Sequence, residues 1–276
     1  MKLTLGFSTC PNDTFIFDAM VHNKIDTEGL KFELVMGDVE ELNKMAINAE
    51  LDITKISYHA FAYIAQNYKI LDSGSALGRN NGPLLISKKK IYPDEVPHLK
   101  VAIPGQHTTA NLILRTAYPE IRCVKEYLFS DIEEVVLDNE VDAGLIIHET
   151  RFTYKKRGLK KILDLGEYWE EKTGFPVPLG GIIVNRKLSD EVQQKVNRVL
   201  RRSIDYAFEN PNSALEFIRQ FAQEMDEQVM YKHIELYVND FTKDLGELGK
   251  KSIRYLLDKA VELSFVDSIP EDIFVS

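Results

Sequence analysis

Short apolar runs alternate with amphipathic segments along the first half of the chain, a pattern typical of β-strands joined by α-helices. The first helix is expected to begin at Asn12 or Asp13 as its N-cap, and a second covers residues 39–49. The expected strands lie at residues 3–7, 32–35, 51–56, 70–73 and 83–87. This order predicts an α/β fold built of βα units around a mainly parallel sheet.

The same alternation starts again near residue 100. Further helices are expected at residues 108–117 and 132–137, and the strands of this second, smaller sheet at residues 101–104, 122–124, 141–147, 158–165 and 181–184. A restart of this kind favours two lobes over one long sheet. We therefore predict a larger α/β lobe made of residues 1–99 and 189–276, and a smaller α/β lobe made of residues 100–188.

Helical periodicity dominates from Ser189 to the C-terminus. Apolar residues share one face in three successive segments, as Val192, Val196 and Val199 do in the first. Because an amphipathic helix buries its apolar face, we expect these helices to close the core of the larger lobe, so that the chain crosses between the lobes twice. The same apolar faces are compatible with a homodimer.

The composition is that of an ordinary globular protein, with 276 residues of which 44% are hydrophobic and 28% charged. The N-terminal apolar run is too short for a signal peptide, and no later run is long enough to span a bilayer, so we expect no membrane insertion. Two cysteines without a CxxC pair indicate a reducing compartment, and we expect a cytoplasmic protein. The net charge of −9 argues against nucleic-acid binding.

Three expected strand-to-helix junctions carry hydroxyl groups and helix-start N–H groups, at residues 9–14, 55–59 and 105–109. Ligands of open α/β sheets bind at the C-terminal ends of strands, where such groups can hold a carboxylate. Any one junction alone is better explained by helix capping. Three at one edge predict a site for a small anionic substrate, with contacts from Asn12, Ser57, Thr108 and Thr109. Lys55 pairs either with a substrate carboxylate or with a neighbouring acid.

His148 directly follows a continuous apolar run, where a buried strand is expected to end. Histidine has an unperturbed pKa close to neutral pH, so this residue is a candidate general base. Position alone favours a hydrogen-bonded structural histidine instead. His59 is expected to be packed in an apolar helix, whereas His107, in a loop that begins with glycine, is a candidate ligand contact. Cys10 has no histidine near it in the sequence, and we expect a buried thiol rather than a nucleophile.

Four segments taken together resemble one enzyme family: GFSTCPNDTFIFDAM, DITKISYHAF, PGQHTTANLIL and GLIIHETRFTY. In this order they are similar to the 1,4-dihydroxy-6-naphthoate synthases of the futalosine route to menaquinone. The resemblance extends to about residue 185, and the helical C-terminal region adds little to it. The family more often has proline where this chain has Thr9, a difference that affects the turn and no expected catalytic atom.

The resemblance implies a two-lobed, type II periplasmic-binding-protein-like fold with a cleft between the lobes and a helical C-terminal region. It implies a lyase that converts cyclic dehypoxanthine futalosine to 1,4-dihydroxy-6-naphthoate and a sugar-derived fragment, without metal or organic cofactor. The sequence also has no HExxH or EF-hand motif. By matching position, His148 is the implied proton acceptor. The implied substrate contacts are Lys55, Ile56, Ser57, Thr109 and Ala110.

For such a reaction, a neutral imidazole at His148 is expected to remove a proton next to the substrate ketone, after which the sugar fragment leaves and the bicycle aromatises. Hydroxyl and N–H groups near Ser57 and Thr109 are expected to hold carboxylate or oxyanion charge. Two alternatives stay open: a solute-binding protein for a small carboxylate, and the sister enzyme chorismate dehydratase. The group that orients His148 is not identified, because Glu149 points elsewhere on a regular backbone.

Overall fold

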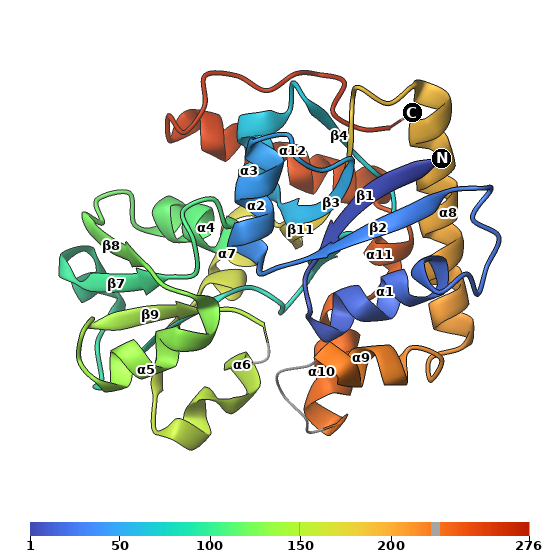
Figure 1. The fold of residues 1–276 in the computed structure, drawn as a ribbon. Helices are drawn as coiled ribbons and strands as arrows, with labels where there is room; N and C mark the ends of the chain where they lie inside the picture. Colours follow the sequence, from blue (N-terminus) through green and yellow to red (C-terminus); the bar gives the residue numbers. More distant parts are fainter. Residues whose placement is uncertain (149, 222–226, 276) are drawn as a thin grey trace.

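Two β-sheets, each covered by helices, organise the chain (Figure 1). The computed structural model describes residues 1–148, 150–221 and 227–275. The first sheet has the strand order β2-β1-β3-β11-β4, with β5 also paired to β11. Its strands are β1 (Lys2–Phe7), β2 (Lys31–Met36), β3 (Ile53–Ser57), β4 (Tyr68–Ile70), β5 (Ala76–Gly78) and β11 (Val177–Asn185).

The first sheet is mixed rather than mainly parallel. Strand β1 runs parallel to β2 and β3, as the βα pattern predicted. Strand β11 runs antiparallel to β3, β4 and β5. The prediction that residues 181–184 complete the second sheet is therefore wrong, because the chain returns from the second sheet and inserts β11 into the middle of the first.

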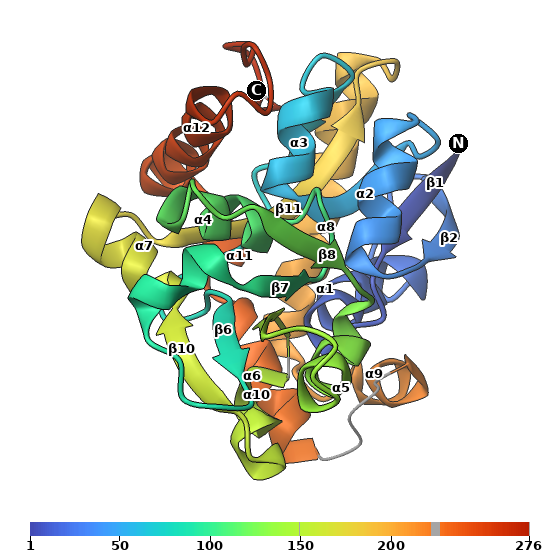
Figure 2. The ribbon, with the colours of Figure 1, turned by 90° about the vertical axis from the view of Figure 1, so that its left-hand side faces the viewer.

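The second sheet has the order β10-β6-β9-β7-β8. Strand β7 is parallel to β8 and β9, whereas β6 is antiparallel to β9 and β10. Figure 2 turns this sheet toward the viewer, with α5 on one side and α4 and α7 on the other. Its strands are β6 (Leu84–Ser87), β7 (Lys100–Ile103), β8 (Cys123–Glu126), β9 (Ala143–Ile146) and β10 (Lys160–Asp164).

We call the first sheet with its helices the first lobe, and the second sheet with its helices the second lobe. The lobe limits at residues 99/100 and 188/189 stay a prediction, since strand pairing does not by itself delimit domains. The pairing of β6 with β9 and of β11 with β3 favours limits nearer residues 80 and 175.

Helices surround both sheets. The α-helices (α) and 3-10 helices (η) of the first half are α1 (Pro11–Val21), α2 (Val39–Ile47), α3 (Tyr58–Ile64), η1 (Pro93–His98), α4 (Thr109–Ala117), η2 (Phe129–Asp131) and α5 (Ile132–Leu137). Those of the second half are α6 (Thr150–Thr153), η3 (Tyr154–Arg157), α7 (Leu165–Thr173), α8 (Asp190–Glu209), α9 (Leu215–Phe221), α10 (Glu227–Tyr237), α11 (Asp240–Lys243) and α12 (Gly246–Glu262). Among the described residues, no helix is long and apolar enough to cross a membrane.

Alternation along the strands decides which core each side chain enters. In β7, Val101 and Ile103 face the cluster that contains Trp169 of α7, whereas Ala102 faces the one that contains Ile132 of α5. The C-terminal helices pack as their apolar faces predicted, with Val196 of α8 in one core with strand β1 and helix α1. The two lobes thus bring the ends of β1, β3 and β9 toward one place.

Candidate functional site

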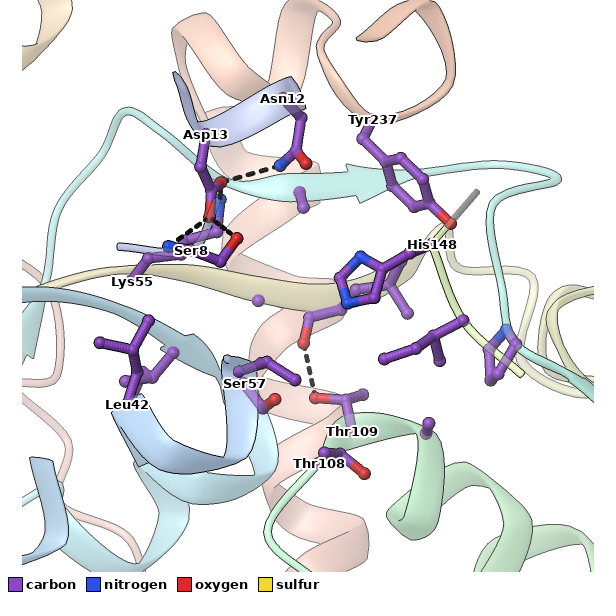
Figure 3. Close-up of a pocket in the computed structure, with 18 of the residues that line it drawn as sticks. Ser8, Asn12, Asp13, Leu42, Lys55, Ser57, Thr108, Thr109, His148 and Tyr237 are labelled. Carbon is purple, nitrogen blue, oxygen red and sulfur yellow. Dashed lines mark hydrogen bonds and ion pairs between the residues drawn. The ribbon is translucent and has the colours of Figure 1, made fainter. Parts of the chain in front are cut away.

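A pocket that is partly open to solvent lies where both lobes meet (Figure 3). All three of the predicted strand-to-helix junctions reach it, from the ends of β1, β3 and β7. Its walls include eight residues that the sequence singled out: Asn12, Lys55, Ile56, Ser57, Thr108, Thr109, Ala110 and His148. Of the predicted contacts, His107 is not among the lining residues.

The first turn of α1 supplies a carboxylate that organises one wall of the pocket. The prediction that Asn12 or Asp13 is the N-cap is wrong, because Cys10 occupies that position and Pro11 begins the helix. The Asp13 carboxylate instead accepts hydrogen bonds from Ser8 Oγ at 2.7 Å and Asn12 Nδ2 at 2.8 Å. This carboxylate therefore fixes the orientation of two polar side chains that line the pocket.

Lys55 pairs with a neighbouring acid, the second of the two predicted alternatives. Its ammonium lies 2.9 Å from Asp13 Oδ1 and also donates to the carbonyl of Gly74 at 3.2 Å. The residue is only 8% exposed. Its charge is therefore compensated within the protein, although Lys55 is one of the residues that line the pocket.

Ser57 occupies the N-cap position of α3, but its side chain makes no capping hydrogen bond to that helix. A side chain of α2 holds it instead. The side chain of Asn43 accepts from Ser57 N at 2.9 Å and donates to Ser57 Oγ at 3.3 Å. It also donates to Glu40 Oε2 at 3.0 Å. Because Asn43 uses the backbone N–H of Ser57, only the hydroxyl of Ser57 is available as a donor to a ligand.

The start of α4 forms the opposite wall. Thr108 is the N-cap of α4, and its hydroxyl accepts from Asn111 N at 3.3 Å. This junction therefore does contain a helix cap, the explanation that the sequence favoured for any single junction. The hydroxyl of Thr109 donates to the Leu179 carbonyl at 2.6 Å and accepts from His59 N at 3.2 Å. The first-turn N–H groups of α4 have no carbonyl four residues back to accept them. These groups, together with the helix dipole, are what α4 can offer a ligand.

His148 projects into the pocket from the end of β9, beyond Ile147 (Figure 3). Its backbone is left-handed, with φ of 58°, which is uncommon outside glycine and costs free energy that the surroundings must offset. The half-buried ring lies between Phe129, with centroids 4.8 Å apart, and His233, with centroids 6.0 Å apart. Glu149, which follows it, lies outside the described residues.

Cys10 is buried, as predicted, but it does have a histidine neighbour in space. Its Sγ lies 3.5 Å from Nδ1 of His148, which is 138 positions away in the sequence. The two residues come from different lobes, one from the start of α1 and the other from the end of β9. Local spacing in the sequence contains no signal for such a contact.

His233, which the sequence reading missed, lies behind His148 with its ring nearly parallel, at 11°. It is fully buried in α10, and its Nε2 lies 2.8 Å from Asn12 Oδ1. Since Asn12 donates through its amide nitrogen to Asp13, its oxygen accepts, and Nε2 of His233 carries the proton. Burial, and next the nearby His148 and Lys55, hold the pKa of His233 well below its usual range.

The two remaining histidines near the site have other contacts. His59 is fully buried, as predicted, and its Nδ1 lies 3.1 Å from the Thr108 carbonyl. Burial lowers the pKa of His59 from 6.5 to about 4. His107 turns toward α2, with Nδ1 2.7 Å from Glu40 Oε1. The site also uses Tyr237 at the end of α10, whose spacing in the sequence indicated only an apolar helix face.

A donor-rich pocket with one imidazole reaching into it suits proton abstraction from a bound anion. Within the described part of the chain, no group of three or more His, Cys, Asp or Glu side chains is arranged to hold a metal ion.

Comparison with known proteins relates the chain to one family. Residues 3–262 match the family described as "Menaquinone biosynthesis". A 1,4-dihydroxy-6-naphthoate synthase of Thermus thermophilus is 42% identical over 273 residues, covering 99% of both chains. A second, from Streptomyces coelicolor, is 38% identical and covers 98% of this chain and 96% of its own.

Solved structures extend the comparison. A protein from Archaeoglobus fulgidus superposes with a TM-score of 0.90 at 38% identity, covering 96% of this chain and 98% of its own. A Candida albicans protein described as having the generic periplasmic binding protein fold superposes with a TM-score of 0.70 at 16% identity, covering 99% and 93%. The second likeness concerns the fold alone, and it agrees with the two-lobed α/β architecture inferred from the sequence.

Proposed function

The chain belongs to the menaquinone-biosynthesis family that it matches, and on this premise we propose that it is a 1,4-dihydroxy-6-naphthoate synthase with His148 as its general base. The reaction is the cleavage of cyclic dehypoxanthine futalosine, a small anionic substrate, to 1,4-dihydroxy-6-naphthoate and a sugar-derived fragment. As a biosynthetic lyase it is proposed to act in the cytoplasm.

The observation that carries the assignment of the base is the placement of His148. It is an imidazole that lines the pocket opposite the donors of α4 and Ser57. A neutral imidazole there accepts the proton next to the substrate ketone. The electron pair left behind expels the sugar-derived fragment, and aromatisation of the bicycle makes the step favourable.

The other pocket residues are proposed to bind and orient the substrate. The N–H groups of Thr109 and Ala110 and the hydroxyl of Ser57 hold carboxylate or developing oxyanion charge. Asn12 has its side chain fixed by Asp13 and His233, and so presents one edge of a rigid amide to the pocket. Lys55 adds positive charge behind this wall, partly offset by its ion pair with Asp13.

Turnover of cyclic dehypoxanthine futalosine by purified protein tests this function. We expect formation of naphthoate by the wild type and a loss of about 10²- to 10⁴-fold in His148→Asn, the usual contribution of a general base. Asparagine is the appropriate replacement because it tolerates the left-handed backbone at this position. His98→Asn, on the exposed η1 turn, is the matched control and should leave turnover unchanged.

Each other result has a definite meaning. Near-normal turnover by His148→Asn would refute the assignment of the base while leaving the lyase function in place. Tight binding of the substrate by the wild type without any product would refute the lyase and favour a solute-binding protein.

A further inference from the structure

We propose that Cys10 is the positioning residue for His148: its sulfur engages Nδ1 of the imidazole, in the place that a carboxylate takes in a Ser-His-Asp triad. This inference rests on the proposed function, because it concerns how the base of that reaction is held. Cys10 is not among the residues that line the pocket, so its effect on the reaction passes through His148.

Because the sulfur lies against Nδ1, Nε2 is the nitrogen of His148 that can face the substrate. The Sγ to Nδ1 distance of 3.5 Å is within the range of a hydrogen bond to sulfur. A base must present an unprotonated nitrogen, and the contact at one ring nitrogen decides which tautomer is present. With Nδ1–H donating to sulfur, Nε2 carries the lone pair that accepts the substrate proton. The imidazolium that forms keeps the same Nδ1–H donor.

Cys10 itself is held in a fixed position. Its backbone N–H donates to Ser8 Oγ at 3.3 Å, and its carbonyl accepts from Asp13 N at 3.0 Å and Thr14 N at 3.1 Å. Cys10 is the N-cap of the eleven-residue helix α1, which begins at Pro11, so its thiol lies at the positive end of the helix dipole.

Two further contacts limit how the His148 ring can turn. The face of the ring lies along the ring of His233, which Asn12 holds in place, and Phe129 packs against it edge-on. These contacts define the plane of the ring, and the sulfur defines its rotation within that plane. Because Cys10 and His233 belong to the first lobe and His148 to the second, the base is oriented only where the two lobes meet.

Cys10→Ala and Cys10→Ser test the role of the sulfur. We expect Cys10→Ala to lower kcat by about 10- to 100-fold, the size of effect seen when the hydrogen-bond partner of a metal-bound histidine is removed. The dissociation constant of the product 1,4-dihydroxy-6-naphthoate should stay within about twofold, since Cys10 lies outside the pocket lining. Cys10→Ser, which keeps a hydrogen-bonding atom, should recover part of the loss. Cys123→Ala, at the exposed second cysteine, is the matched control and should behave as wild type.

A double-mutant cycle separates positioning from a merely structural effect. If Cys10 acts through His148, Cys10→Ala costs nothing further in the His148→Asn background. An equal loss in both backgrounds would overturn the proposal, and so would wild-type kcat in Cys10→Ala. Normal turnover in His148→Asn alone would instead refute the base on which the inference rests, so the two failures are distinguishable. Urea unfolding of Cys10→Ser checks that the comparison is made on folded protein.

Discussion

The ammonium of Lys55 lies 2.9 Å from the carboxylate of Asp13, although the two residues are only 8% and 2% exposed. This buried ion pair joins the middle of β3 to the first turn of α1. The same carboxylate accepts from Ser8 and Asn12, so one side chain ties together three pocket residues. The proposed site for an anion therefore contains a carboxylate whose charge is already compensated.

Removing one partner of this pair should destabilise the protein strongly. In Asp13→Ala the buried ammonium of Lys55 loses its counter-charge, and we expect a loss of about 3–5 kcal/mol in the free energy of unfolding by urea. Glu33→Ala, which removes the exposed partner of Lys2, is the control and should cost less than about 1 kcal/mol. Equal effects of the two changes would show that burial does not govern this pair.

Thr109 should matter to stability as well as to binding. If Thr109 were only a substrate contact, Thr109→Val would weaken binding or turnover without unfolding the protein. The structure changes this expectation, because valine leaves the Leu179 carbonyl and the His59 N–H without the hydroxyl that serves both. We expect a loss of about 1–3 kcal/mol in thermal or urea unfolding. Thr109→Ser keeps the hydroxyl and should stay near wild type in stability and turnover. A fully stable Thr109→Val would contradict this role.

Acid should weaken the fold through His59. Its pKa is lowered from 6.5 to about 4 by burial, so between these values the unfolded chain binds the proton and the folded chain does not. The stabilising contribution is therefore complete above pH 6.5 and is lost as the pH falls toward 4, by about 3 kcal/mol in all. The buried His233 acts in the same direction.

Stability curves of His59→Asn and wild type between pH 7.5 and pH 4.5 check this sign. Asparagine can still donate to the Thr108 carbonyl, and the pH dependence of its unfolding free energy should be weaker than that of the wild type. His98→Asn, at an exposed histidine, should keep the wild-type slope. An unchanged slope in His59→Asn would mean that the pKa of His59 is the same in the folded and unfolded states.

Gly82 lies where two backbone segments approach closely. A Cβ at this position would lie 2.3 Å from the Cα of Gly166, so backbone must move to admit alanine. We expect Gly82→Ala to destabilise by about 1–3 kcal/mol and to reduce turnover, because the adjacent Pro83 lines the pocket. Gly37→Ala is the matched control, since its Cβ would meet only the flexible end of Glu41. Similar melting temperatures for the two variants would contradict the close approach.

Much of the fold was predictable because apolar periodicity reports burial residue by residue. Strands β1, β2 and β3 and helices α4 and α5 lie within a few residues of their predicted positions. Strand β5 was missed within a loop rich in glycine and asparagine, because three residues are too short for an alternation to register. The antiparallel insertion of β11 was missed because strand direction depends on long-range pairing.

The candidate site was likewise predictable in part from the sequence. The junctions at Asn12, Ser57 and Thr108 were predictable from hydroxyl groups at strand ends, and they do meet in one pocket. The hydrogen-bond partners of those groups could not be predicted. Which hydroxyl caps a helix, and which is free for a ligand, depends on neighbours such as Asn43 and Leu179 that are distant in the sequence.

The sequence by itself determined the two-lobed α/β class and the strand-end junctions that line the pocket, because these follow from local pattern and residue chemistry, and the family resemblance singled out His148 as the candidate base. Only the tertiary structure decided that Lys55 is paired with Asp13, that His233 lies along the ring of His148, and that Cys10 meets its Nδ1. These contacts join segments far apart in the chain. Their energies come from burial and from distances of a few ångströms, which no local pattern encodes.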